Sequence, residues 1–600
     1  MKKNNSNEIE MTFPKTKMQW ILDIMGKYKW LYLVGIFGTI LYNIMQITVP
    51  YFSGTLVDEF LTGENAAYNF ANNRPYFYQL IACMVGFTFL RVCIVYGTCF
   101  ICEVCSQTVL YKVRTALFDK IEHQDMKFFA KYRTGDLMTR LTGDMDAVRH
   151  MIAWVVRAVI ESIALVSATA IYFFYMDWLL ALSLLVLAPI IFIIIVLFKN
   201  ESGPMHRQLR ERLSAMNTAA QENIAGNRVV KAFAREEYEN NKFDNTNKDY
   251  RDTNEKTALV WIKYFPYMEM MANLLPVILL LVGGLFIIGG RITVGEYFAF
   301  SCMIWAIANP MRQLGMIMNE FQRFNAGATK VMELYYSEPE IKDHEDAVDV
   351  SDRLKGKIEF NNVSFRYPDG NLPVLNGVTF SAEPGETIAI IGETGCGKTS
   401  LIQMIPRFYE AIDGEILIDG VNVNDYKLKQ LRTNIGFATQ DVLLYSDSID
   451  NNIAFGDSDL SMKEIEKYAK YSQAAHFISK MPDGYGTVVG ERGVGLSGGQ
   501  KQRISLARAL AVRPSILILD DTTSAVDMET EKLIQESLEN LDFECTKIII
   551  AQRISTTKKA DKILVLKDGH IIESGSHTEL INQGGYYYEL VKLQYGEEAV

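Results

Sequence analysis

Long apolar runs alternate with polar stretches over the first 320 residues, and short β-type runs alternate with helical segments after residue 355. About 20 helical residues cross a hydrocarbon core of about 30 Å. Three runs reach that length without a charge, at 31–50, 178–198 and 270–290. Three more are shorter or carry a charge, at 76–102, 162–176 and 297–311. The pattern therefore predicts six membrane-spanning helices.

Two polar stretches of this region, 105–155 and 200–262, are too long for simple turns and are rich in helix-forming residues. We expect them to be cytoplasmic extensions of the spanning helices, with bends that reach a cytoplasmic domain. The segment 18–29 mixes Trp20, Ile21 and Leu22 with Lys27 and Lys29, which is typical of a helix lying at a membrane interface.

Basic residues lie mostly on one side of the predicted spans. They precede the first run and follow the second, whereas the short loops near 74, 177 and 291 contain few of them. Because cytoplasmic loops carry the excess of Lys and Arg, both termini are predicted to be cytoplasmic in a multi-pass protein of the cell membrane. Charges inside or next to the spans are either substrate contacts or are paired with one another: Arg91, Arg157, Glu161 and Glu269.

The composition narrows the function classes. The net charge of −11 argues against nucleic acid as a partner, because neutralising phosphates requires a basic surface. Cys102 and Cys105 form a CxxC pair, but no second pair completes a metal site, so we interpret them as helix-packing residues. The frequent Asn, Lys and Ile residues favour a bacterial source.

A glycine-rich loop lies between a β-type run at 387–391 and a predicted helix at 398–408. In such a loop backbone N–H groups surround phosphates, Lys398 supplies charge to the β- and γ-phosphates, and the Thr399 hydroxyl binds Mg²⁺. A buried apolar run at 516–519 delivers the carboxylate of Asp520 to the same metal. We predict an ATP and Mg²⁺ site made by the loop and the residue after it: Gly392, Glu393, Thr394, Gly395, Cys396, Gly397, Lys398, Thr399 and Ser400.

Further motifs complete an ordered set in this half of the chain. The sequence LSGGQ at 496–500 matches a signature that other phosphate-loop enzymes lack, and with it the chain resembles a half-transporter of the ATP-binding-cassette exporter family. The resemblance implies that Tyr367 stacks on adenine and that Gln440 senses the γ-phosphate, joining Thr399 and Asp520 at Mg²⁺. Asp136 and Gly226 lie in regions like the family's intracellular coupling loops.

The apolar runs, the polar unpatterned stretch around 335–355 and the motifs after it predict a division of the chain into four parts. These are a cytoplasmic N-terminal segment with the interfacial helix at 1–29, a transmembrane domain with six helices and two coupling loops at 30–335, a linker at 336–354, and an α/β ABC nucleotide-binding domain at 355–600. Cassettes of this family work as pairs in which one chain's signature completes the other's ATP site. The residues expected to contact the partner's ATP are Ser497, Gly498, Gly499, Gln500 and Asp527.

Two positions depart from the family pattern. Most members have Glu where this chain has Asp521, and His where it has Gln552. A carboxylate shorter by about 1.5 Å should not reach the attacking water, and Gln does not exchange a proton near neutral pH. A positioned base contributes about 10²–10⁴ in rate, so this site should bind ATP and hydrolyse it poorly.

A homodimer would contain two impaired sites, whereas the signature of this chain is intact. We therefore expect a non-identical half-transporter as partner, and export of an amphiphile such as a drug-like compound, a lipid or a peptide. Three alternatives remain open: an ATP-gated channel, a homodimeric exporter that tolerates the two substitutions, and an importer.

Overall fold

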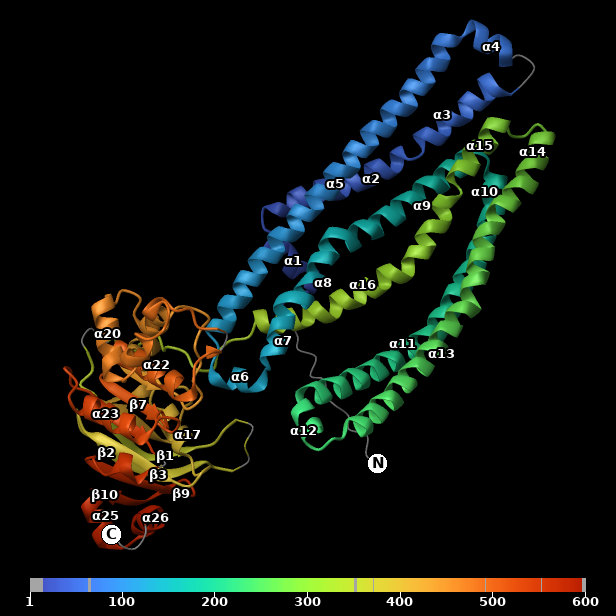
Figure 1. Cartoon of the computed structure of the whole chain (residues 1–600). Helices are drawn as coiled ribbons and strands as arrows, with labels where there is room; N and C mark the ends of the chain where they lie inside the picture. The colour runs from blue at the N-terminus through green and yellow to red at the C-terminus, as the bar shows by residue number, and fades with distance from the viewer. Residues whose placement is uncertain are drawn as a thin grey trace. The chain divides into compact units, whose positions relative to one another are not determined.

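The computed structural model describes residues 14–62, 66–349, 353–368, 370, 372–490, 493–551 and 553–595. It divides into two compact units, Met1–Glu122 with Gly135–Ser337, and His123–Thr134 with Glu338–Val600. The first unit is helical and the second contains both helices and strands (Figure 1). The predicted order, a helical domain followed by an α/β domain, is thus observed.

The helical unit consists of long helices interrupted by short π-helical turns. Its α-helices are α1 (Lys17–Met25), α2 (Tyr28–Met45), α3 (Thr48–Leu56), α4 (Ala66–Asn72), α5 (Arg74–Glu122), α7 (Thr134–Thr139), α8 (Met145–His150), α9 (Val156–Met176), α10 (Trp178–Leu185), α11 (Leu187–Ala225), α12 (Asn227–Ala232), α13 (Glu236–Ile278), α14 (Gly284–Ile288), α15 (Val294–Met303) and α16 (Trp305–Tyr335). The π-helical turns are η1 (Val57–Leu61), η2 (Arg140–Asp144), η3 (Met151–Val155) and η4 (Leu279–Gly283).

Within the described residues, four helical stretches are long and apolar enough to span a membrane: Tyr28–Leu61, Arg74–Glu122, Thr134–Met176 and Glu236–Ile288. The other two predicted runs, 178–198 and 297–311, lie in α10 with α11 and in α15 with α16, and each is interrupted at a single residue, Val186 or Ile304. All six predicted runs are therefore helical over most of their length, and the number of six crossings stays a prediction.

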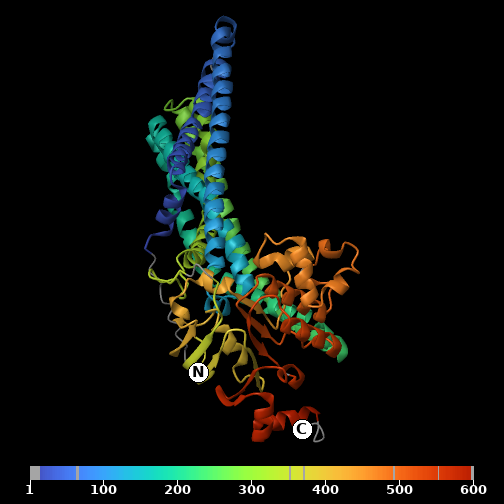
Figure 2. The ribbon, with the colours of Figure 1, turned by 90° about the vertical axis from the view of Figure 1, so that its left-hand side faces the viewer.

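The predicted polar extensions are helices. α5 continues for 49 residues, well past the end of its apolar run, and Figure 2 shows its uninterrupted course. α11 and α13 lie side by side and are joined through the short α12 (Figure 1). Polar side chains hold this hairpin together, since Lys263 and Tyr264 of α13 both donate hydrogen bonds to Glu201 of α11, at 2.8 and 2.6 Å.

Two interpretations of the membrane half agree with the observed contacts. Arg157 and Glu161 form an ion pair of 3.3 Å one turn apart on α9, as the pairing alternative requires. Cys102 and Cys105 are fully buried on α5, where the Cys105 thiol lies 3.7 Å from the Tyr28 carbonyl of α2, so both act in helix packing.

The α/β unit contains two sheets. Its strands are β1 (Ile358–Phe365), β2 (Leu375–Ala382), β3 (Thr387–Gly392), β4 (Asp413–Ile418), β5 (Val421–Asn422), β6 (Ile435–Ala438), β7 (Ile516–Asp520), β8 (Thr546–Ile550), β9 (Lys562–Lys567) and β10 (His570–Gly575). An antiparallel sheet has the order β2-β1-β4-β5, and a larger sheet has the order β10-β9-β3-β8-β7-β6 with β10 antiparallel and the other strands parallel.

After β3, the α/β unit also contains ten α-helices in its described part. They are α17 (Lys398–Gln403), α18 (Leu428–Thr433), α19 (Ile449–Ile453), α20 (Met462–Tyr471), α21 (Ala475–Ile478), α22 (Gly498–Ala511), α23 (Met528–Glu539), α24 (Ile554–Thr557), α25 (His577–Gln583) and α26 (Tyr586–Tyr595), with 3₁₀ turns at Val423–Asp425, Ala454–Gly456 and Gly484–Gly486. α17 ends at Gln403, so the predicted helix at 398–408 is too long: five of its residues, 404–408, lie in turns and a bend.

β7 shows how the apolar pattern organises this unit. Ile516 and Ile518 belong to the core that the two sheets share with α17, whereas Leu517 and Leu519 belong to the core beneath α19 to α22. Successive side chains of a strand point to opposite faces, so a continuous apolar run fills both cores at once. Only the last residue of the strand, Asp520, is charged.

The segment His123–Thr134 groups with the α/β unit although it lies far earlier in the chain. Its short helix α6 (Met126–Lys131) is capped by Asp125, whose carboxylate accepts from the Phe128 N–H at 2.9 Å and from the Glu340 N–H at 2.8 Å. Lys127 pairs with Glu340 at 2.5 Å. One bend of the first polar extension is thereby tied to the start of the α/β unit.

Candidate nucleotide site

The parallel strands of the large sheet bring the predicted site residues to one edge. β3 ends at Gly392, β7 ends at Asp520, and Asp520 pairs in register with Ile550 at the end of β8. Gln440 follows β6 by two residues and is exposed. Gln552 follows β8 by two residues and lies outside the described residues. Ligands of α/β sheets bind at this carboxyl edge, so the sheet topology itself assembles the site.

Two glycines allow the loop after β3 to form. A Cβ on Gly392 would lie 2.1 Å from the Leu566 carbonyl oxygen, which no side chain tolerates. Gly397 has a φ of +106°, in the left-handed region, and a Cβ there would lie 2.8 Å from Leu375. The loop therefore packs its backbone tightly against its neighbours, which leaves its N–H groups available to form a cradle for phosphate.

Lys398 folds over this cradle. Its ammonium donates hydrogen bonds to the carbonyl oxygens of Gly392 and Glu393, at 2.8 and 2.7 Å. The Cys396 thiol is buried, and this burial raises its pKa. The loop therefore holds one cation at its centre and a neutral thiol beside it, which fits the binding of phosphate oxygens.

Asp520 and Thr399 form the metal side of the site. The Thr399 hydroxyl donates to the Asp520 carboxylate at 3.4 Å. Asp520 is 4% exposed, and burial raises its pKa, with the neighbouring Asp521 charge adding to the effect. A desolvated carboxylate beside a hydroxyl is a set of hard oxygen donors that fits Mg²⁺.

Asp521 is held firmly in place. It is 8% exposed and adopts a φ of +49°, a conformation that Asp tolerates better than most residues. Burial raises the pKa of its carboxyl, while the Ser524 hydroxyl and the charge of Arg553 lower it. The Asp521 carbonyl also accepts a hydrogen bond from Ser524 Oγ at 3.0 Å. The short carboxylate is therefore fixed at the end of β7 by its own backbone.

Tyr367 lies against the loop. Its hydroxyl is 2.8 Å from Ser400 Oγ, and its ring contacts Phe365 and Tyr409 with centroid distances of 4.9 and 5.3 Å. The predicted aromatic residue and the phosphate loop are thus neighbours, as a nucleotide bound by its base and its phosphates requires.

The signature forms the start of α22. Ser497 and Gln500 make reciprocal capping hydrogen bonds, with Gln500 N–H donating to the Ser497 hydroxyl and Ser497 N–H donating to the Gln500 amide oxygen at 2.9 Å. Gly498 and Gly499 follow the cap, and a Cβ on Gly499 would lie 2.7 Å from the Ala525 carbonyl oxygen. The glycines thus allow α22 to begin directly against the loop 524–527.

Asp527 ends that loop as the N-cap of α23. Its carboxylate accepts from the Thr530 N–H at 2.9 Å, and this hydrogen bond lowers its pKa. The carboxylate thus orders its own chain, and its contact with a partner's ATP stays a prediction.

Three side chains that the motifs did not single out connect these parts. Gln502 of α22 donates to Ser524 Oγ at 3.1 Å and accepts from the Ala525 N–H at 3.0 Å. The buried Glu531 of α23 accepts from Arg553, which follows position 552, at 2.8 Å. The sequence held two signals for these contacts: a glutamine two residues after LSGGQ and a carboxylate four residues after Asp527.

The third side chain is Tyr586 of the C-terminal helix α26. Its hydroxyl donates to the Glu393 carboxylate at 2.6 Å, and this contact raises the Tyr586 pKa to about 12. The Glu573 carboxylate accepts from the backbone N–H of Tyr587, at 2.9 Å, and so positions the start of α26. The C-terminal helix is thereby connected to the phosphate loop.

Two family models match the chain. One, described as "ABC transporter transmembrane region", covers residues 32–311, and one described as "ABC transporter" covers residues 375–524. An uncharacterized ABC transporter ATP-binding protein of Bacillus subtilis (strain 168), YknU, is 35% identical over 589 residues, which is 97% of either chain. An ATP-dependent lipid A-core flippase of Syntrophus aciditrophicus (strain SB) is 36% identical over 494 residues, 82% of either chain.

A solved structure matches as well. It is described as the structure of a bacterial Atm1-family ABC exporter with ATP bound. The superposition has a TM-score of 0.78 at 25% identity and covers 95% of this chain and 99% of the other.

Proposed function

This chain belongs to the ABC transporter family and has the architecture of an exporter half, and from that premise we propose that it is the weakly hydrolysing half of an unequal pair. A transmembrane helical domain precedes an ABC nucleotide-binding domain, as the sequence predicted. ATP-driven export is the activity of this architecture. The proposal concerns how two ATP sites divide that activity.

The observation that carries the proposal is the residue after the metal-side aspartate. Asp521 lies at the end of β7, fixed by its φ of +49° and by the Ser524 hydroxyl on its carbonyl. Its carboxylate is one methylene shorter than the glutamate usual in the family, and Gln replaces the usual His at 552. Both groups that would activate water at this chain's own ATP are therefore altered.

The residues that bind ATP are intact. Lys398 would hold the β- and γ-phosphates, Thr399 and Asp520 would hold Mg²⁺, and Tyr367 would support the base. Mg²⁺, when bound, neutralises charge on the phosphates. This chain's site is therefore proposed to retain ATP over many transport cycles and to act as a stable half of the closed pair.

The second site would form between this chain's signature and the partner's phosphate loop. The Ser497 cap leaves the N–H groups of Gly498 and Gly499 at the start of a 14-residue helix, where they favour an anion. With a partner that carries the usual glutamate and histidine, this second site would hydrolyse ATP and reset the cycle.

The proposed cargo is a lipid or another amphiphile. Relatives over most of this chain are named lipid A-core flippases, and the described spans expose many large apolar side chains. In the predicted orientation both termini and the nucleotide-binding domain lie in the cytoplasm, so cargo would move from the inner leaflet outward.

Restoring the missing groups tests the proposal. In the assembled pair, with the partner's own glutamate changed to Gln so that its site is silent, Asp521→Glu combined with Gln552→His should raise ATP turnover by about 10²-fold. Unchanged turnover, with ATP binding intact, would contradict the roles given to these positions. An ion current far above ATP turnover would instead identify a channel.

A further inference from the structure

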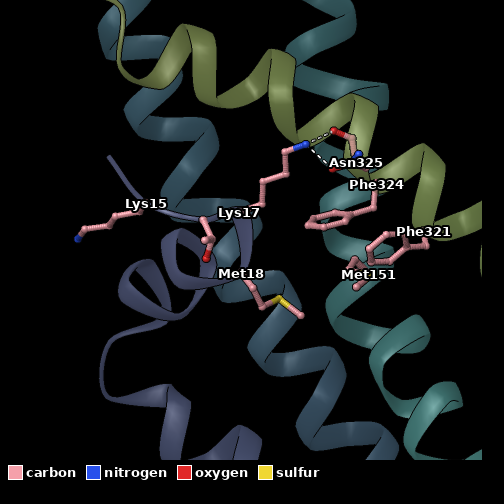
Figure 3. A pocket seen from close by; sticks show the side chains of 8 residues that line it. Lys15, Lys17, Met18, Met151, Phe321, Phe324 and Asn325 are labelled. Carbon is pink, nitrogen blue, oxygen red and sulfur yellow. Dashed lines mark hydrogen bonds between the residues drawn. The ribbon is translucent and has the colours of Figure 1, made fainter. Parts of the chain in front are cut away.

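A cavity of about 490 Å³ lies in the helical unit, beside the N-terminal helix α1 (Figure 3). It is bounded by the residues that lead into α1, by the turn η3 and by the second half of α16. Its volume is in the range of about 300–1,000 Å³ that is common for small-molecule sites. None of its lining residues has a role in the nucleotide site.

The floor and wall of the cavity are apolar. Met151 and Phe324 form a buried floor, at 6% and 4% exposure, whereas Met18 and Phe321 form a wall that stays partly exposed. A surface of this kind fits a hydrocarbon chain, because apolar area is removed from water over a buried base.

The rim of the cavity is cationic. Lys17 Nζ donates to the Asn325 carbonyl oxygen at 2.8 Å and also to its side-chain oxygen, and burial lowers the pKa of Lys17. Lys15 points away from the cavity (Figure 3) and pairs with Asp23 at 2.6 Å. Among the described residues that line the cavity none is acidic, so the charge facing it comes from Lys17.

The helix that carries this rim is arranged as an interfacial helix. Trp20 is buried and packs edge-on against Tyr335 at the end of α16, with ring centroids 5.6 Å apart. On the other side of α1, Met18 and Leu22 expose apolar side chains between flanking lysines. An apolar face with basic flanks is typical of a helix that lies among lipid headgroups.

We propose that this cavity binds one membrane phospholipid with an anionic headgroup, distinct from the transported cargo. The headgroup contacts Lys17, and one acyl chain lies along Met18 and Phe321 over Phe324. The choice of occupant follows from charge complementarity. The partly buried ammonium of Lys17 is bound by the two Asn325 oxygens, and among the described lining residues no carboxylate neutralises it. A lipid there holds α1 against α16, the helix whose chain continues into the nucleotide-binding domain.

The test is lipid retention by the assembled transporter. The protein is reconstituted in nanodiscs of dioleoylphosphatidylcholine in which about one fifth of the lipid is the anionic dioleoylphosphatidylglycerol. The protein is then extracted mildly, and its bound lipid is counted by native mass spectrometry. Lys17→Gln keeps a donor for Asn325 but removes the charge, so retained phosphatidylglycerol should fall about tenfold. Lys29→Gln, an exposed lysine outside the cavity, should stay within about twofold of the parent.

A second variant keeps the test decisive if Lys17→Gln fails to fold. Phe321→Ala removes part of the exposed wall and should also reduce retention of phosphatidylglycerol. Equal retention by the parent, Lys17→Gln and Phe321→Ala would overturn the proposal. Equal retention of phosphatidylcholine and phosphatidylglycerol by the parent would also overturn it. Lipid binding that is seen only after deletion of residues 1–13 would overturn it too, because that segment would then be what fills the cavity. The inference does not depend on an unequal pair.

Discussion

Gln502 offers a direct test of how the signature helix controls the shared ATP site. It is 6% exposed, donates to Ser524 Oγ at 3.1 Å and accepts from the Ala525 N–H at 3.0 Å. Its amide also donates to the Asp521 carbonyl oxygen at 3.4 Å. Gln502→Leu keeps most of the volume but removes all three hydrogen bonds. Losing the bonds to Ser524 and Asp521 costs about 0.5–1.5 kcal/mol each, and leaving the Ala525 N–H without its partner costs about 1–3 kcal/mol. Residues 521–527 are therefore expected to lose about 2–6 kcal/mol of their attachment to α22.

This loss of free energy should lower the rate of ATP turnover. Each 1.4 kcal/mol corresponds to about a factor of ten in a population, so the lower end of this loss already lowers the fraction of correctly placed loops by more than about tenfold. We expect ATP turnover by the assembled transporter to fall about tenfold or more. ATP binding at this chain's own loop should change less than about twofold, because Lys398 and its neighbours are held by separate contacts.

The assay is ATP hydrolysis in proteoliposomes, together with titration of a fluorescent ATP analogue. Gln535→Leu is the matched control, because Gln535 is a glutamine of α23 whose buried side-chain nitrogen has no hydrogen-bond partner in the described part of the chain. Equal turnover in the Gln502→Leu and Gln535→Leu proteins would refute the argument that these three hydrogen bonds position the loop.

Three further predictions concern single residues. Lys398→Ala should weaken ATP binding by this chain at least about tenfold in a nucleotide titration, because it removes the cation of the phosphate loop, and unchanged affinity would refute its role. Tyr586→Phe removes the 2.6 Å hydrogen bond to Glu393 and leaves the charge of that carboxylate unscreened near the phosphates. ATP binding should therefore weaken about threefold, whereas parent-like affinity would show that the contact does not affect binding. Burial raises the Asp521 pKa above its ordinary value of 3.8, so the charged form opposes folding once the pH rises above that value. Asp521→Asn should therefore raise the thermal midpoint at pH 7 and lose this advantage below about pH 4, and equal midpoints at pH 7 would contradict the argument.

The phosphate loop and β7 were predictable because their signals are local. Glycines spaced around Lys398 specify a loop that only small residues can form, and a continuous apolar run ending in Asp520 specifies a strand buried on both faces. The parallel sheet then brings these segments to one edge by topology. The apolar runs of the membrane domain are local signals of the same kind.

Tertiary contacts account for what the sequence did not reveal. The helix after the phosphate loop ends at Gln403 because the chain turns at Pro406, whose carbonyl accepts from the Arg432 guanidinium at 3.1 Å, and Arg407 adopts a φ of +53°. Pro406 was a signal for that ending. The contact of Tyr586 with Glu393 joins residues 193 positions apart, and no local pattern in the sequence predicts it.

The central claim concerns the unequal work of two ATP sites. Its most direct test is the ATP turnover of this chain purified alone in proteoliposomes, compared with the same chain assembled with a second half-transporter that carries Glu and His at the two altered positions. We predict that the chain alone turns over at least about 10²-fold more slowly than the pair. Equal turnover, with cargo transported by two identical copies, would contradict the claim.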